Sequence, residues 1–227
     1  MKINRLALRL CMCALVLLRA LSLYADGKDS LSRKMIHMAG IDVKPAYVFP
    51  THEFFAGNNA TFSPIRKNLS VHLKYGFKFA PDTYFGRMYP HAVQGIGVGY
   101  NTFFHSSELG NPWSVYAFQT SRIASLTPRL SLDYEWNFGA SFGWKKYDAE
   151  SNPYNRVVGS KMNAYIHLSF LLNWQLDAQT NLRAGIGATH FSNGNTAYPN
   201  AGVNTLGASI GLTRYFGGTS RATLADG

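Results

Sequence analysis

Strict alternation of apolar and polar side chains is the feature that most limits how this chain can fold. From Leu130 to Trp144 every even position is apolar or aromatic, and every odd position is polar or glycine. Because successive side chains of a β-strand point to opposite faces, this stretch predicts a strand with one apolar and one polar face. At 15 residues it is also longer than most strands of soluble proteins.

The same alternation recurs in two other stretches, 69–79 and 162–176. A soluble β-sandwich also alternates, but it rarely holds one register for so long, or sets Asp, Glu, Lys and His on one face behind such large aromatics on the other. In a transmembrane barrel the lipid takes the apolar face and the lumen takes the polar face. After residue 25, no segment approaches the apolar length of a transmembrane helix.

Counting such stretches gives an all-β fold, an eight-stranded antiparallel transmembrane β-barrel. Pro45 interrupts the first expected strand, and the fourth has aromatics on both faces. We expect both termini to face the periplasm, short periplasmic turns at 126–129 and 177–180, and long outer loops; the connection 81–91 is long for a periplasmic turn. The expected strands are 40–49, 68–80, 92–104, 113–125, 130–146, 162–176, 181–193 and 203–216.

The first 25 residues are typical of a secretory signal peptide. Basic residues lead, an apolar run from Leu10 to Leu23 follows, and Ala25 supplies a small residue for cleavage. We therefore expect a mature chain of one domain, residues 26–227, which begins at Asp26 and ends in a polar tail over 217–227. Both cysteines, Cys11 and Cys13, lie in the signal, so the mature chain has no disulfide and no Cys-ligated metal site.

The composition of the mature chain is typical of a protein that contacts a membrane surface. Removing the four basic residues of the signal leaves 18 Lys and Arg against 12 Asp and Glu, a net charge of +6. This charge suits anionic lipid, and the 32 aromatic residues of the full sequence, all but Tyr24 after the signal, suit girdles at the two membrane interfaces. No run of clustered Lys and Arg interleaved with aromatics appears, so we expect no nucleic-acid partner.

One group of residues has the chemistry of an activated nucleophile. On the strand expected at 181–193, His190 and Ser192 continue the apolar face at its outer end, and Asn204 lies on the same face of the next strand. A serine, a histidine that takes its proton and a third group that holds the other imidazole nitrogen form a catalytic arrangement. The alternative is a set of ordinary polar residues on the rim of a barrel, where polar groups cost less than at the midplane.

The stretch His190-Phe191-Ser192-Asn193-Gly194, followed by Pro199-Asn200 and Gly202, resembles the active-site hairpin of the outer-membrane lipid A 3-O-deacylases, the PagL-like family. The resemblance implies a base at His190, a nucleophile at Ser192 and an oxyanion donor at Asn200. The family's Glu, fourteen residues after the His, falls on Asn204, which departs from the pattern. An amide oxygen can accept from an imidazole, but it carries no full charge.

The resemblance implies a serine esterase integral to the Gram-negative outer membrane, which removes an ester-linked acyl chain from lipid A of lipopolysaccharide and needs no metal or cofactor. Some members are described as acyloxyacyl hydrolases, so the position of the ester stays open. Two alternatives also remain: a non-catalytic barrel with a structural or adhesion role, supported by Asn204, and a phospholipase or acyltransferase that uses the same residues. The sequence leaves open whether the barrel forms a homodimer.

Overall fold

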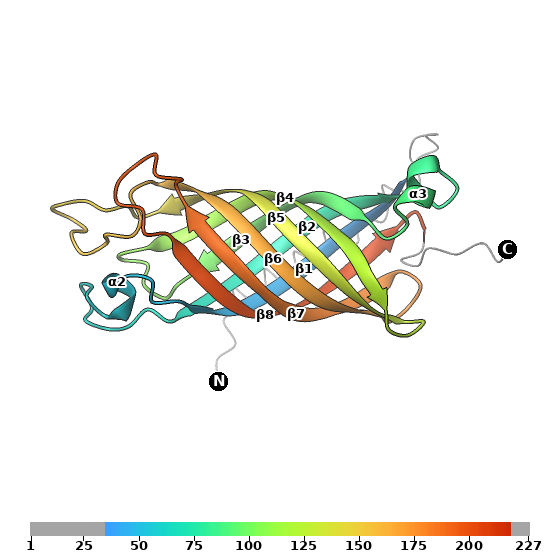
Figure 1. Ribbon diagram of the computed structural model, residues 1–227, viewed down its shortest axis with the longest axis horizontal. Helices are drawn as coiled ribbons and strands as arrows, with labels where there is room; N and C mark the ends of the chain where they lie inside the picture. Colours follow the sequence, from blue (N-terminus) through green and yellow to red (C-terminus); the bar gives the residue numbers. More distant parts are fainter. Residues whose placement is uncertain (1–34, 219–227) are drawn as a thin grey trace, which may run out of the picture.

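Eight antiparallel strands close into one barrel in the computed structural model, which describes residues 35–218 (Figure 1). Each strand pairs with its neighbours in the chain, and β1 pairs with β8 to close the sheet. The expected signal peptide, the start at Asp26 and all but two residues of the expected tail lie outside the described residues. The strands are β1 Met35–Val48, β2 Lys67–Phe79, β3 Val93–Thr102, β4 Gly110–Ser125, β5 Leu130–Trp144, β6 Met162–Gln175, β7 Thr180–Ser192 and β8 Val203–Phe216.

The expected fold is confirmed, although β1 and β4 begin several residues earlier than the sequence indicated. Strand β1 begins at Met35, five residues before the expected start at 40, because Ile36 and Met38 point inward and hide the alternation there. Pro45 lies inside this strand: it pairs with Leu69 of β2, whereas no residue of β8 pairs with it. A strand tolerates proline where it donates no ladder hydrogen bond.

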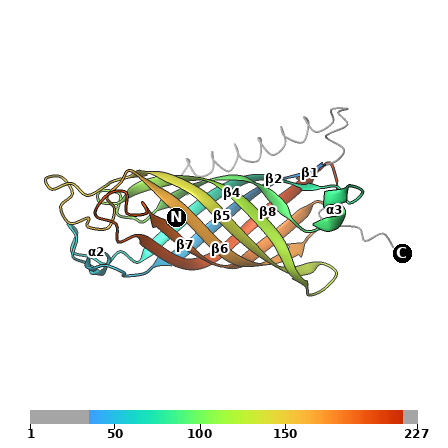
Figure 2. The ribbon, with the colours of Figure 1, turned by 45° about the horizontal axis from the view of Figure 1, so that its top comes forward.

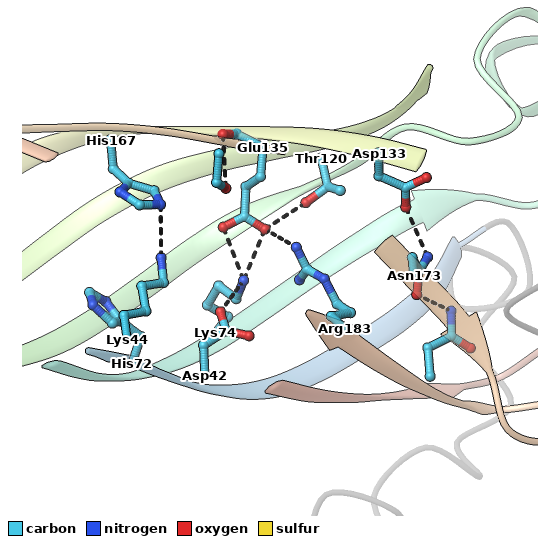
Figure 3. Close-up of polar contacts among 12 residues, drawn as sticks. Asp42, Lys44, His72, Lys74, Thr120, Asp133, Glu135, His167, Asn173 and Arg183 are labelled. Atoms are coloured by element: carbon cyan, nitrogen blue, oxygen red, sulfur yellow. Dashed lines mark hydrogen bonds and ion pairs between the residues drawn. The ribbon is translucent and has the colours of Figure 1, made fainter. Parts of the chain in front are cut away.

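The two faces of the barrel follow the alternation of the sequence. Leu168 is 49% exposed on the outer face, whereas its neighbour Ser169 is 2% exposed and points into the lumen. At the centre of the lumen, Lys74 Nζ lies 2.5 Å from Asp42 Oδ2 and 2.9 Å from Glu135 Oε2, and Arg183 also contacts Glu135 (Figure 3). These four buried charges are thus paired across strands β1, β2, β5 and β7.

The two ends of the barrel differ (Figure 2). One end, called here the loop end, carries the connections 49–66, 103–109, 145–161 and 193–202, the first of which contains the short helix α2, Glu53–Ala56. The other end, the terminal end, is where β1 starts and β8 stops, and it carries helix α3, Tyr84–Met88. Thr83 caps α3, accepting a 3.0 Å hydrogen bond from the Gly86 backbone N. This helix accounts for the length of the connection 80–92. In the described part of the chain, no helix is both long and apolar enough to cross a membrane.

Candidate active site

The predicted placement of His190 and Asn204 on one face is confirmed at the loop end of β7 and β8. The two residues are direct partners in the ladder, and His190 Nδ1 lies 2.7 Å from Asn204 Oδ1. An amide oxygen only accepts, so Nδ1 carries the proton and Nε2 keeps its lone pair. Within residues 35–218, Asn204 is the one hydrogen-bond partner of the His190 ring. The imidazole is therefore held in the tautomer that a general base needs.

Phe191 fixes the direction in which its two neighbours point. Its side chain is 2% exposed in the lumen, with its ring 5.1 Å from Trp144, 5.5 Å from Tyr165 and 6.3 Å from Phe103. Because side chains alternate along a strand, this inward anchor holds His190 and Ser192 on the outer face. The site is thus built on a rigid strand end, supported by an aromatic cluster.

Ser192 is the last residue of β7 and lies opposite Ala164 of β6. It is half-buried, and its Cα is about 7 Å from that of His190, as expected for residues two apart in a strand. No hydrogen bond between Ser192 Oγ and His190 is formed among the described residues. The side chains share a face and can close this separation by rotation, and such contacts often tighten only when substrate binds.

Asn200 is part of a compact loop that follows the strand. Its Oδ1 accepts a 3.1 Å hydrogen bond from the Asn193 backbone N, and its Nδ2 donates to Asn195 Oδ1 at 3.1 Å. An amide nitrogen has two protons, so one remains for another acceptor. The loop is also tied to the connection 145–161, since Ala201 N donates to Val157 O at 3.2 Å.

Gly202 lies against the imidazole of His190. The sequence indicated Gly202 only as part of the motif and did not predict this contact. Its φ is +71°, and a Cβ there would lie 3.1 Å from His190 Cε1. Both the backbone conformation and the contact favour a residue without a side chain. The glycine of the motif pointed to this position, but its contact with His190 depends on three-dimensional packing.

Apolar side chains surround the site on the outer face. Ile166 lies opposite His190 on β6, and Leu206 follows Asn204 on the same face of β8. On the other side β1 ends beside β8: Tyr47 pairs with Leu206, and the Phe49 backbone N donates to Asn204 O at 2.9 Å. These four side chains are 40–47% exposed. Sequence reasoning missed Tyr47 and Phe49, because only closure of the barrel brings β1 beside β8.

This geometry supports nucleophilic attack on a substrate that lies in the membrane. A hydroxyl and an oriented imidazole share the outer face of β7, next to side chains that suit hydrocarbon, and the Asn200 amide lies in the loop that follows. Among residues 35–218 no cluster of three His, Cys, Asp or Glu side chains could hold a metal ion. The third member of the arrangement is a neutral amide, so this site lacks the carboxylate that would stabilise an imidazolium.

Comparison with known proteins identifies a family. The family model described as "Lipid A 3-O-deacylase (PagL)" matches residues 53–213. The crystal structure of the outer membrane enzyme PagL is similar, with a TM-score of 0.53 and 11% sequence identity over 76% of this chain and 97% of that one. Neisserial surface protein A matches with a TM-score of 0.49 and 8% identity over 81% and 97%. No curated protein matched this chain.

The family match spans well over half of the chain and includes β7, β8 and the loop between them. The structural match to PagL supports the same barrel architecture. The chain therefore belongs to the PagL family of lipid A 3-O-deacylases, ester hydrolases built on an outer-membrane β-barrel.

Proposed function

We propose that Ser192, His190 and Asn204 carry the deacylation of lipid A in this protein, and that the ester cut is the 3-O ester named by the family. The observation that supports this most directly is the 2.7 Å contact from His190 Nδ1 to Asn204 Oδ1, since it leaves Nε2 free to act as a base. His190 Nε2 takes the Ser192 proton as Oγ attacks the ester carbonyl. The resulting imidazolium then protonates the leaving sugar oxygen, and water hydrolyses the acyl-enzyme by the same steps.

Asn200 is the proposed oxyanion donor, through the Nδ2 proton that Asn195 does not accept. Such a donor acts most strongly where charge develops in the transition state, and losing one costs roughly 10²- to 10³-fold in turnover. Its hydrogen bonds to Asn193 and Asn195 hold the amide in place before the substrate arrives.

The proposed reaction takes place within one barrel, because every group it uses comes from β7, β8 or the loop between them. Outer-membrane lipid faces the surrounding side chains, and lipid A is the substrate. A homodimer is not required by this chemistry, and crosslinking in native membranes would detect one. We further propose that residues 1–25 export the chain and are removed before Asp26.

The first test compares lipid A from cells that express the wild-type protein, the S192A variant or neither, by mass spectrometry. We expect loss of one ester-linked acyl chain with the wild type and none with S192A, while both fold and reach the outer membrane. Unchanged lipid A with folded wild type would favour a structural or adhesion protein. Altered phospholipids in place of lipid A would indicate a phospholipase or acyltransferase.

The second test addresses the amide that stands at the family's Glu position. Asn204→Ala removes a hydrogen bond that becomes charge-assisted in the transition state, worth about 1.5 to 3 kcal/mol, or roughly ten- to a hundredfold in kcat. This loss is smaller than that of S192A, because nucleophile and base remain. Asn204→Glu supplies a carboxylate that favours the imidazolium, so we expect equal or higher activity and an acid limb of the pH–rate profile moved to higher pH. An inactive but folded Asn204→Glu enzyme, or full activity in both Ala variants, would contradict the mechanism.

A further inference from the structure

Helix α3 exposes a group of large apolar side chains at the terminal end of the barrel (Figure 1). Tyr84, Phe85, Met88 and Tyr89 are 52–65% exposed, whereas Gly86 is the buried residue of the helix. Large apolar side chains that are exposed together generally mark a surface that contacts lipid or another molecule.

The helix is held firmly against the end of β2. A Cβ at Gly86 would overlap the Ala80 carbonyl oxygen, so only glycine lets the helix pack so closely there. Thr83 Oγ1 donates a 2.7 Å hydrogen bond to the same oxygen, and Arg87 Nη1 donates one of 2.7 Å to Asp82 O. The aromatic side chains of α3 are therefore presented from a fixed backbone.

A groove lies between α3 and the outer wall of β3 and β4. Its volume is about 340 Å³, which is within the range of about 300 to 1,000 Å³ that is common for ligand sites. The ring of Phe85 packs on that of Phe79, with centroids 5.2 Å apart, and forms part of the lining. The lining residues are Phe79, Phe85, Tyr89, Ala92, Gln94 and Gln119.

Two amides lie side by side in this groove. Gln94 and Gln119 are direct partners in the ladder of β3 and β4, and the next outer pair toward the loop end is Ile96 with Ala117. The apolar surface of these two strands thus gives way to amides at this level. Gln119 Oε1 accepts a 3.2 Å hydrogen bond from Trp136 Nε1, whereas neither amide nitrogen donates to another residue of the range 35–218. The groove therefore combines aromatic rings with unused hydrogen-bond donors.

We propose that this groove binds one glycerophospholipid of the periplasmic leaflet. An acyl chain packs on Phe79, Phe85 and Tyr89, and the two amides donate to the ester carbonyl oxygens where that chain begins. Membrane interfaces favour such a combination of aromatic rings and polar groups.

The position of the groove on the barrel supports a phospholipid as its ligand. The groove continues the outer face of the barrel, which is the surface that contacts the bilayer. The terminal end also carries the short connections 126–129 and 176–179, and outer-membrane barrels have their short turns in the periplasm. The leaflet at that end consists of glycerophospholipid. Because His190 and Ser192 lie at the loop end, the proposal does not depend on deacylation.

The test is native mass spectrometry of the protein, purified from outer membranes, delipidated in a non-ionic detergent and titrated with phosphatidylethanolamine. We expect one phospholipid to bind clearly more tightly than those that follow. Phe85→Ala removes part of the lining and should weaken this first binding about five- to tenfold, because the ring covers part of an acyl chain. The matched control is Tyr84→Ala, which removes an exposed aromatic ring from the same helix but outside the groove and should leave the affinity unchanged.

A second variant fills the groove without removing an aromatic ring. Ala92→Phe should weaken the first binding by at least about tenfold, because the added ring occupies the space of the acyl chain. Its control is Ala184→Phe, at an exposed position on the outer face of β7. Equal affinities in wild type, Phe85→Ala and Ala92→Phe would overturn the proposal. Equal losses in Tyr84→Ala and Phe85→Ala would also contradict it, since they would mean that α3 anchors the barrel at the interface without a specific ligand. Displacement of the bound phospholipid by an equal concentration of lipopolysaccharide would rule out selectivity for the periplasmic leaflet.

Discussion

Gly202 shapes the candidate site without contributing a functional group. Its left-handed backbone turns the chain into β8, and the missing Cβ leaves room for the His190 ring, which a side chain would approach to 3.1 Å. Contacts of 3.1 Å force a neighbour to move, and the neighbour here is the imidazole that must align with Ser192. Small displacements of reacting groups can cost about 10²-fold in rate.

Gly202→Ala should therefore lower deacylation by one to two orders of magnitude while the barrel still folds. The matched control is Gly194→Ala in the same loop, where φ is also positive, at +62°, but a Cβ would meet nothing within 4 Å. Both variants carry about 1 to 2 kcal/mol of backbone strain, so their stabilities should be similar. Lipid A turnover and urea unfolding, measured together, check this; equal activities would show that the contact with His190 is unimportant.

At this scale the sequence predicted which residues share a face, but not how they are held. The alternation placed His190 and Asn204 on one face, and the register of the hairpin makes them direct partners. The hydrogen bonds of Asn200 to Asn193 and Asn195 depend on loop geometry that no periodicity encodes. The catalytic roles of these residues stay predictions.

Strands with a polar inner face were predictable, and strands without one were not. Strand β5 was located within two residues because its buried positions include Asp133, Glu135 and Asn137. The start of β1 was missed because apolar Ile36 and Met38 point inward there. Helix α3 has five residues, too few for a helical period to be detected.

Two arginine substitutions on the outer face of β6, at different depths in the membrane, test how this strand is placed in the bilayer. Leu168 lies midway along this strand and Met162 at its loop end, and both are exposed on the outer face, by 49% and 62%. Leu168→Arg should lower the free energy of unfolding by about 2 to 4 kcal/mol, whereas Met162→Arg should cost about 0 to 1 kcal/mol, because water and headgroups reach the rim. Urea titrations in lipid vesicles measure both; equal costs would mean that Leu168 does not lie at the membrane midplane.

Closure of the barrel creates a network that no single strand contains. Glu135 accepts hydrogen bonds from Lys74 Nζ and from Thr120 Oγ1 at 2.8 Å, and it pairs with Arg183, so one carboxylate joins β2, β4 and β7 to β5 (Figure 3). The sequence predicted that these charges face the lumen, but their pairing depends on positions up to 61 residues apart. The strand register fixes which charges meet.

This network predicts a large difference between two identical substitutions. Glu135→Gln leaves Lys74 with Asp42, but it removes from Arg183 its one carboxylate partner among the described residues. A buried cation that loses its partner costs about 3 to 5 kcal/mol of stability. Glu150→Gln, at an exposed position of the loop 145–161, should stay within about 0.5 kcal/mol of wild type.

Free energies of unfolding in lipid vesicles measure this difference, and lipid A turnover of the folded fraction separates stability from chemistry. Glu135 points into the lumen, whereas His190 and Ser192 lie on the outer face at the loop end, so folded Glu135→Gln protein should keep wild-type turnover. If Glu135→Gln were no less stable than Glu150→Gln, the lumen would be hydrated enough to screen its charges. A loss of turnover without a loss of stability would instead mean that the central network positions β7.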